Sequence, residues 1–215
     1  MDGSRTLYLE ELDEHYHSTF GAIQESLHVF IREGFSRCIL RNLRILEIGF
    51  GTGLNCYLTL MECLRKDVHV HYYAAEKFPV PQEIWNNLKY CDKMEDDNSG
   101  LFEKLHTIPW NCNVEINDQF TICKMECDVL QTDFIDLPQI DLVFFDAFSP
   151  EKQPELWDIS VFEKIFSRMN FGGILVTYCA KGSVRRLLQT VGFTVERIPG
   201  PPGKREMLRA IKLND

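Results

Sequence analysis

The chain has 215 residues, and its 45% hydrophobic content supplies enough apolar material for the core of one α/β domain and excludes wholesale disorder. Its formal net charge of -9 argues against a surface covered in positive potential, and no stretch approaches the roughly 18 apolar residues of a membrane span. The first residues lack the apolar core of a signal peptide, and the eight cysteines form no C-x-x-C pair, so we expect reduced thiols, no bound metal and a cytoplasmic location.

The first predicted elements form a strand, a glycine turn and a helix. Residues 6–12 alternate weakly and predict a short hairpin or an extended arm, and the apolar spacing over 21–35 predicts an amphipathic helix. A short apolar run over 43–48 then predicts a strand covered on both faces, and residues 54–64 return to helical spacing. This order is the entry of a doubly wound α/β domain.

Three glycines separate that strand from the helix that follows it. Glycine permits positive φ and the close approach of a ligand that a Cβ atom would block. The spacing differs from the G-x-G-x-x-G of dinucleotide folds, and it resembles motif I of class I S-adenosylmethionine-dependent methyltransferases. A nicotinamide or flavin site and a purely structural turn are the alternatives. For a methyl-donor site the candidate cofactor contacts are Glu47, Gly49, Gly51, Thr52, Gly53 and Asn55.

Acidic residues follow the next two predicted strands. The strand over 68–75 ends at Glu76, where this architecture binds ribose hydroxyls, although a surface glutamate is the alternative, and its neighbour Lys77 joins the candidate cofactor contacts. The strand over 120–127 leads to Asp128 and Val129, where class I methyltransferases often bind the adenine amino group through an acid. Asp133 in the same loop is a rival for that role.

The remaining segments continue the alternation of helices and strands. Helices are predicted over 79–90, 161–169 and 183–190, a loop over 92–99, a further apolar-patterned segment over 101–110, and strands over 140–145, 173–179, 193–198 and 207–213. We therefore expect an α/β fold with a seven-stranded, mostly parallel sheet and helices on both faces. It would form a single domain over 1–215, with an N-terminal arm and helix over 1–40 and a cofactor-binding core over 41–215.

A second candidate site follows the most apolar strand. Ligands of open α/β sheets bind outside the carboxyl ends of the strands, so Asp146 is expected to face the same crevice as the glycine turn. A carboxylate there can accept a hydrogen bond from an amine and orient its lone pair toward a methyl group, which makes Asp146 the catalytic candidate. Phe148 and Trp157 offer flat faces for stacking, in a loop stiffened by Pro150 and Pro154. The alternative is a helix N-cap aspartate with aromatic residues of the core.

Positive charge is concentrated near the C-terminus. Residues 181–209 hold seven basic and two acidic side chains, so this segment carries +5 and the rest of the chain carries -14. Such a segment can bind a polyanion on one face, or it can be an ordinary solvated surface, and charge alone does not separate the two.

Several spaced motifs carry a family resemblance. They are Gly-Phe-Gly-Thr-Gly-Leu-Asn at 49–55, Asp-Ala-Phe-Ser-Pro with Lys-x-Pro-x-x-Trp at 146–157, Lys-Gly-Ser-Val-Arg-Arg at 181–186 and Pro-Pro-Gly-Lys-Arg-Glu-Met-Leu at 201–208. Together with an opening segment over 16–30, they resemble the methyltransferase domain of MnmC, the bifunctional enzyme that makes 5-methylaminomethyl-2-thiouridine at the tRNA wobble position. The resemblance extends over 16–209, nearly the whole chain.

The resemblance implies a reaction and its partners. The donor would be S-adenosyl-L-methionine, and the acceptor a 5-aminomethyl-(2-thio)uridine of tRNA that becomes 5-methylaminomethyl-(2-thio)uridine. The bifunctional protein continues into a flavin-dependent oxidase domain. We expect no such domain here and therefore the final methylation only, with the aminomethyl group supplied by other enzymes or a separate oxidase. The expected substrate contacts are Phe148, Pro150, Lys152, Trp157, Arg185, Arg186, Lys204 and Arg205. His15 and His17 lie near the site by family position, although isolated histidines are more often structural.

Two other functions stay open at this point. An aminopropyltransferase or another small-amine methyltransferase would use the same fold, but polyamines call for further acids around Asp146, and its neighbours over 147–150 are Ala-Phe-Ser-Pro. A non-catalytic module that binds tRNA or another partner is the alternative from a different class. The intact acids Glu47, Glu76 and Asp146 argue against such a loss of activity.

Overall fold

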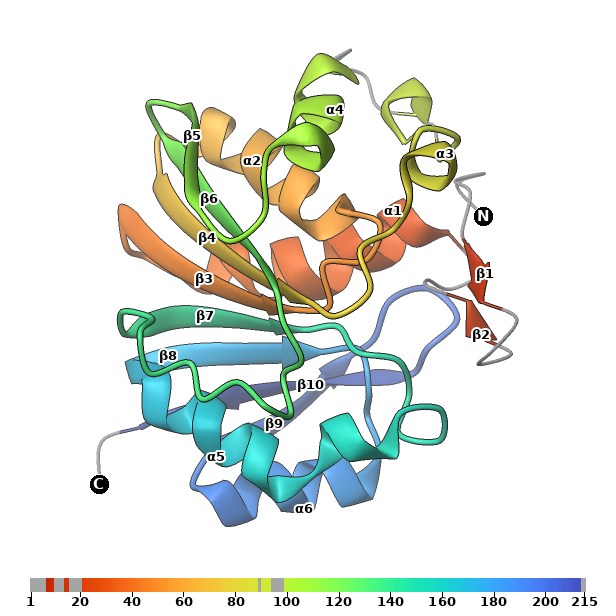
Figure 1. Ribbon diagram of the computed structural model, residues 1–215. Helices are drawn as coiled ribbons and strands as arrows, with labels where there is room; N and C mark the ends of the chain where they lie inside the picture. Colours follow the sequence, from red (N-terminus) through yellow and green to blue (C-terminus); the bar gives the residue numbers. More distant parts are fainter. Residues whose placement is uncertain (1–6, 10–13, 16–20, 89, 94–98, 214–215) are drawn as a thin grey trace.

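The computed structural model describes residues 7–9, 14–15, 21–88, 90–93 and 99–213 (Figure 1). Its strands are β1 (Tyr8–Leu9), β2 (Glu14–His15), β3 (Asn42–Ile48), β4 (His69–Glu76), β5 (Asn113–Asn117), β6 (Phe120–Glu126), β7 (Ile140–Phe145), β8 (Met169–Thr177), β9 (Thr194–Pro199) and β10 (Glu206–Ile211). Its α-helices are α1 (Ala22–Ser26), α2 (Leu54–Lys66), α3 (Gln82–Trp85), α4 (Ser99–Thr107), α5 (Ile159–Arg168) and α6 (Gly182–Val191). A π-helical turn, Leu27–Arg32, continues α1, and short 3-10 turns span Phe35–Arg37, Cys91–Lys93 and Pro154–Trp157.

The described strands form one large mixed sheet and a small hairpin. The large sheet has eight strands in the order β5-β6-β4-β3-β7-β8-β10-β9, and β1 pairs with β2 in the position expected for a hairpin or arm. Strands β6, β4, β3, β7 and β8 run parallel to one another, whereas β5, β10 and β9 join in antiparallel pairings. The predicted α/β class is therefore confirmed. His17, which the sequence analysis placed near the site, lies outside the described residues.

Two details of the sequence prediction are wrong. The expected count of seven strands misses β5, a half-exposed edge strand in which only Val114 and Ile116 are apolar, so its pattern is too short to stand out. The helix expected over 79–90 is reduced to the four residues of α3, which begins only after Pro81. The loop expected over 92–99 falls mostly on residues that are not described.

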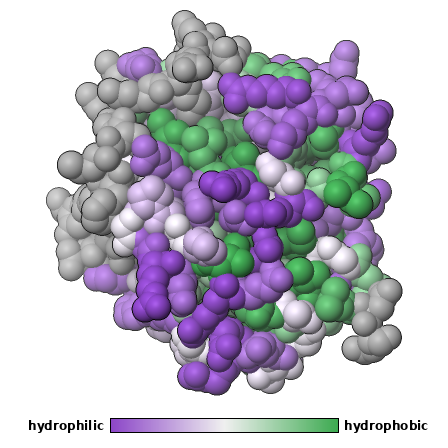
Figure 2. All heavy atoms as spheres, turned by 180° about the vertical axis from the view of Figure 1, so that it is seen from behind, coloured by the Kyte–Doolittle hydropathy of each residue, from purple (hydrophilic) through white to green (hydrophobic). Residues whose placement is uncertain are grey.

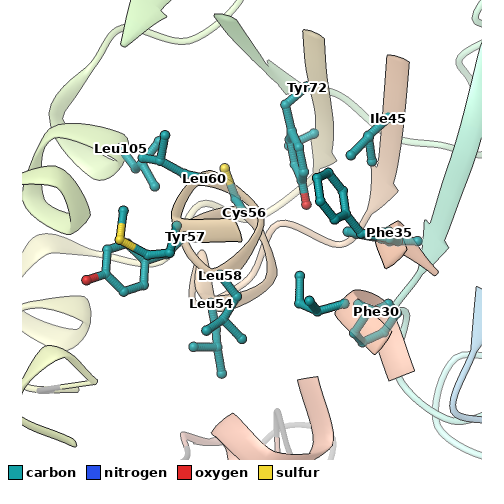
Figure 3. Packing of buried hydrophobic residues seen from close by; sticks show 14 of the residues in the cluster. Phe30, Phe35, Ile45, Leu54, Cys56, Tyr57, Leu58, Leu60, Tyr72 and Leu105 are labelled. Atoms are coloured by element: carbon teal, nitrogen blue, oxygen red, sulfur yellow. The ribbon is translucent and has the colours of Figure 1, made fainter. Parts of the chain in front are cut away.

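Helices cover both faces of the large sheet. Figure 1 shows α1, α2 and α4 on one face and α5 and α6 on the other, and each face has its own cluster of buried apolar side chains. On the first face, α2 lies at the centre of the core, where Cys56, Tyr57 and Leu60 are fully buried (Figure 3). All eight cysteines are free thiols.

The surface mixes polar and apolar groups. Figure 2 shows the side opposite to that of Figure 1, where hydrophilic side chains alternate with separate apolar patches. No helix among the described residues is long and apolar enough to cross a membrane.

The glycine turn after β3 packs against the neighbouring strand β7. Gly49 has a φ of +91°, and a Cβ atom there would lie 2.7 Å from the backbone oxygen of Asp146. The amide of Gly49 also donates to Ala75 O at 2.9 Å, and the amide of Asp146 donates to Ile48 O at 3.0 Å. Glycine is thus required at this position by contacts within the protein.

We expect Gly49→Ala to destabilise the fold by on the order of 1–3 kcal/mol, because it combines an unfavourable φ with a backbone clash. The matched control is Gly100→Ala, where a Cβ atom meets nothing within 4 Å inside α4, so stability should be unchanged or raised by less than about 1 kcal/mol. Urea unfolding of both variants measures the difference, and equal effects would contradict this account.

Candidate active site

The topology brings the ends of β3 and β7 together. The chain leaves β3 toward β4 on one side of the sheet, and β7 lies on its other side, so the order of the strands reverses between β3 and β7. Such a switch point is where open α/β sheets bind ligands, outside the carboxyl ends of the strands. The glycine turn follows β3 and Asp146 follows β7, so both lie at this point.

A single amide joins the two strands at the switch point. Asn55, buried in the first turn of α2, donates from Nδ2 to Oε1 of Glu47 at 3.0 Å and to Oδ2 of Asp146 at 2.8 Å. Glu47 lies inside β3 with no exposed surface, whereas Asp146 is partly buried at the end of β7. The amide therefore fixes the two carboxyl groups relative to each other.

Burial controls the ionisation of these two acids. It raises the pKa of Glu47 well above its usual range, and the nearby Asp146 adds to the effect, while the hydrogen bond from Asn55 and the neighbouring Tyr72 side chain oppose it. Burial also raises the pKa of Asp146 to about 7; the charge of Glu25 adds to this rise, and the Asn55 bond and the charge of Lys204 oppose it. Neighbouring acids whose pKa values are both raised by burial are typical of functional sites.

The carboxyl group of Glu76, the last residue of β4, lies over the glycine turn. It accepts hydrogen bonds from the amides of Gly51 at 2.9 Å and Phe78 at 2.8 Å. Burial raises its pKa, although these backbone donors act in the opposite direction. The sequence predicted Glu76 beside the turn, and the geometry agrees with that placement; its role toward ribose hydroxyls stays a prediction.

Asp128 lies beside the end of β4, whereas Asp133, the other candidate for the adenine contact, lies beside α5. Lys77 forms an ion pair with Asp128 at 2.8 Å, and this contact lowers the pKa of the aspartate. Asp133 is largely exposed, and its ion pair at 3.8 Å is with Lys164 of α5. Val129 is buried in the core cluster of the second face. Of the two candidate acids, Asp128 is the one placed near the glycine turn.

A cluster of aromatic and basic side chains packs against the glycine turn, and the sequence analysis did not predict it. His106 of α4 contacts Thr52 O through Nε2 at 3.1 Å and stacks on Trp85 with ring centroids 4.5 Å apart. Lys124 of β6 is fully buried, donates to His106 O at 2.7 Å and lies 4.6 Å from the centre of the Trp110 ring. Burial lowers the pKa of His106 to about 4 and that of Lys124 to about 8.

The polar atoms at the switch point fit the methionine end of S-adenosyl-L-methionine. Among the described residues, Oε2 of Glu47 and Oδ1 of Asn55 are buried acceptors without a hydrogen-bond partner. Buried acceptors call for a donor, and an α-ammonium group supplies several. No group of three metal-ligating side chains is found in the described part of the chain.

Trp157 and Lys204 were predicted to contact the substrate, but both side chains are engaged within the protein. Trp157 is only 6% exposed; it packs on Phe145 with centroids 4.9 Å apart and donates from Nε1 to Phe148 O at 2.8 Å, so it cannot stack on a base. Lys204 donates to the buried carboxyl group of Glu25 at 2.6 Å, so its charge is already paired. Phe148, Pro150 and Lys152 are partly buried in the same loop, and their roles stay predictions.

Several basic side chains of the segment over 181–209 form ion pairs with carboxylates of the protein. Lys181 pairs with Glu151, Arg197 with Glu206 at 3.6 Å, and Arg209 with Glu33 and Glu196, both at 2.9 Å. Arg185, Arg186 and Arg205 form no ion pair within the described ranges, and the last two are exposed. The Arg186 and Arg197 guanidinium groups both lie close to Gly182, at the first turn of α6. The basic side chains open to a polyanion are therefore fewer than the sequence suggests.

Two residues near Asp146 received no role from the sequence. Glu25 belongs to α1 and is only 7% exposed. Its carboxyl group therefore lies on the buried face of the helix, where helical spacing predicts apolar side chains. Tyr178 follows β8 and donates from its hydroxyl to Ala147 O at 2.9 Å. A charged residue on the buried face of an amphipathic helix is the one signal that sequence alone offered for Glu25.

Comparison with known proteins identifies a family. Residues 89–213 match a family model described as S-adenosyl-L-methionine-dependent methyltransferase. The bifunctional protein MnmC, named for tRNA 5-methylaminomethyl-2-thiouridine biosynthesis, is 31% identical in Chromobacterium violaceum over 89% of this chain and 30% identical in Leptospira borgpetersenii over 93%. The chain spans about one third of the length of these relatives. The crystal structure of MnmC2 from Aquifex aeolicus has a TM-score of 0.78 at 30% identity, covering 99% of this chain and 69% of that one.

The raised pKa of Asp146 predicts a pH-dependent stability. A carboxyl group with a folded-state pKa of about 7 and an ordinary value of 3.8 stabilises the fold fully below pH 3.8, and this contribution is lost as the pH rises through 7. Relative to wild type, Asp146→Asn should therefore gain stability between pH 4 and pH 8, as measured by urea midpoints.

Asp158→Asn is the control for this experiment. Hydrogen bonds with Ser160 lower the pKa of this exposed N-cap residue of α5, so its contribution to stability is lost as the pH falls and not as it rises. A parallel trend in the two variants would show that burial of Asp146 is not the cause.

Proposed function

Because the chain belongs to the family of S-adenosyl-L-methionine-dependent methyltransferases that includes MnmC2, we propose that its acceptor is the primary amine of a 5-aminomethyl-(2-thio)uridine at the wobble position of tRNA. The product is 5-methylaminomethyl-(2-thio)uridine. The observation that carries the proposal is the Asn55 bridge, which holds the Asp146 carboxyl group at the switch point beside the glycine turn. The names of the relatives support the tRNA acceptor.

The residues at the switch point have separate tasks in this reaction. Glu47, Asn55, Glu76 and the glycine turn would hold S-adenosyl-L-methionine, whose sulfonium makes its methyl group electrophilic. The acceptor nitrogen would form the new bond to that carbon with its lone pair while the bond between the methyl carbon and the sulfonium sulfur breaks. The electron pair of the broken bond would stay on sulfur, so that S-adenosylhomocysteine leaves, and the nitrogen would release one proton to water. Asp146 accepts a hydrogen bond from the amine and orients the lone pair, and proximity supplies much of the rate.

The ionisation of Asp146 suits this task. A primary amine is mostly protonated at neutral pH, and an ordinary carboxylate is a weak base toward it. With a pKa of about 7, the Asp146 carboxyl group differs less in pKa from a primary amine than an ordinary carboxyl group does. Proton transfer from the amine to Asp146 is therefore less unfavourable. Burial at the site also disfavours the charged form of the amine.

The remaining substrate contacts concern the nucleic acid. Arg186 and Arg205 are exposed and offer guanidinium groups to phosphates, with Arg185 and Lys152 as less exposed neighbours. A wobble base that leaves its stack can be received by an aromatic face, and Phe148 is the aromatic residue of the Asp146 loop proposed for this contact. An enzyme that supplies the aminomethyl group, such as a separate oxidase, is the proposed upstream partner, and the cytoplasm is the proposed location.

The central test is methyl transfer to tRNA that carries 5-aminomethyl uridine, with nucleoside mass analysis of the product. Asp146→Ala should lose most of the turnover, on the order of 100-fold or more for a group that orients a nucleophile, and should retain binding of S-adenosyl-L-methionine in calorimetry. Glu155→Ala, an exposed acid of the same loop, is the control and should behave as wild type. Methylation of free small amines in preference to the tRNA would contradict the proposed acceptor.

The phosphate contacts predict a salt-dependent interaction. Arg186→Gln and Arg205→Gln should each weaken tRNA binding and reduce the slope of log affinity against log salt by about one, since each removes one phosphate contact. Filter binding at several salt concentrations measures this slope. Arg209→Gln is not a suitable control because Arg209 pairs with Glu33 and Glu196. Arg41→Gln, at an exposed residue just before the start of β3, is used instead, and its slope should match wild type.

A further inference from the structure

An ion pair joins α1 to the loop before β10, and both of its charges act on Asp146. Nζ of Lys204 donates to Oε1 of Glu25 at 2.6 Å, and the same nitrogen lies 4.0 Å from the centre of the Tyr178 ring. The side chain of Glu25 is 8% exposed and that of Lys204 35%. The ammonium group is thus held by a carboxylate and an aromatic face together, which is a tight and specific arrangement.

The fold explains why these distant residues meet. Strand β10 runs antiparallel to β8 with Leu208 opposite Thr177, so the loop that precedes β10 lies beside the residue that follows β8. Lys204 is in that loop, which a hydrogen bond from its amide to Pro201 O closes at 2.9 Å. The helical segment that carries Glu25 is tied to the same hairpin a second time, through His28 Nε2 and Pro199 O at 2.9 Å.

The pair is connected to the segment that follows β7 through Tyr178. Tyr178, on which the ammonium group lies, donates its hydroxyl to Ala147 O, and Ala147 follows Asp146. The charges of Glu25 and Lys204 act on the Asp146 carboxyl group in opposite directions: Glu25 raises its pKa and Lys204 lowers it. The other groups that face this carboxyl group are Asn55 from α2, Glu47 from β3 and Tyr72 from β4.

Stability alone gives little reason for such a pair. The desolvation of two charges offsets most of their attraction, so a buried ion pair is weak evidence for a stabilising role. Without the Lys204 ammonium group, by contrast, the negative charge of Glu25 would favour protonation of Asp146, because that charge raises the pKa of the Asp146 carboxyl group. Lys204 removes this conflict.

We propose that Lys204 is a positioning residue that offsets the charge of Glu25. It thereby increases the share of Asp146 in the anionic form that accepts a hydrogen bond from the acceptor amine, and it is not a contact to tRNA phosphate. This inference rests on the proposed amine methylation for its functional meaning. The charge balance itself is a property of the protein without substrate, and it can be measured in that form.

The first experiment follows the Asp146 carboxyl group by ¹³C NMR in protein labelled at aspartate, with the resonance assigned from Asp146→Asn. Lys204→Met should raise the pKa of this group by about one unit, because an adjacent positive charge is lost. Lys204→Arg should stay close to wild type. The double variant Glu25→Gln with Lys204→Met should return toward wild type, because both charges are then absent and no buried carboxylate is left unpaired.

The second experiment uses the neighbouring arginine as a matched control. Lys204→Met should leave the salt slope of tRNA binding at its wild-type value, whereas Arg205→Met should reduce it. In methyl-transfer assays, the acidic limb of kcat/KM for Lys204→Met should move to higher pH by the same amount as the NMR titration, and the double variant should reverse the shift. Arg205→Met should leave the NMR titration of Asp146 unchanged.

Three results would overturn the inference: an unchanged Asp146 titration in Lys204→Met, no recovery in the double variant, or a loss of salt slope equal to that of Arg205→Met. Failure of the wild-type protein to methylate aminomethyl uridine would overturn the proposed function instead. The two failures are distinguishable because the NMR titration requires no acceptor.

Discussion

The geometry of the candidate site depends on the two hydrogen bonds from the Asn55 amide. They join Glu47 of β3 to Asp146 after β7, across the point where the strand order reverses. Without this donor, two buried acids would repel each other, and neither would have a fixed orientation. The amide thus holds two acids of different exposure, the fully buried Glu47 and the partly buried Asp146, at one point of the sheet. The proposed division of labour between donor and acceptor sides follows from that difference.

Contacts within the protein hold the glycine turn on two sides. A side chain at Gly49 would meet the backbone of Asp146, and one at Gly53 would meet His106 at 2.9 Å. The turn is therefore held between the end of β7 on one side and the cluster of His106, Trp85 and Lys124, from α4, α3 and β6, on the other. A rigid turn presents its backbone amides in a constant direction, which is what preorganised binding requires.

Charge in this chain is organised in pairs more than in patches. The segment over 181–209 carries a net positive charge in the sequence, yet Lys181, Arg197, Lys204 and Arg209 all have carboxylate partners. These partners come from other parts of the fold or from the opposite strand of the β9–β10 hairpin. Only a few arginines are left to meet a polyanion, which suits a local contact to one tRNA region better than an extended basic surface. The same pairing gives Lys204 its proposed influence on Asp146.

The sequence by itself determined the α/β class, most strands of the large sheet, the glycine turn and the acids at its edge, because these depend on local periodicity and on residue types at strand ends. It missed β5, whose edge position needs few apolar residues, and it overextended α3. It placed Trp157 and Lys204 at the substrate, since an aromatic residue and a lysine in a loop resemble surface contacts. Only the tertiary structure decided that Trp157 packs in the core and that Lys204 pairs with Glu25, 179 residues away in the chain. The antiparallel pairing of β10 with β8 places the loop of Lys204 beside Tyr178 and so near Glu25. Local sequence patterns do not encode which residues of two distant strands lie opposite each other.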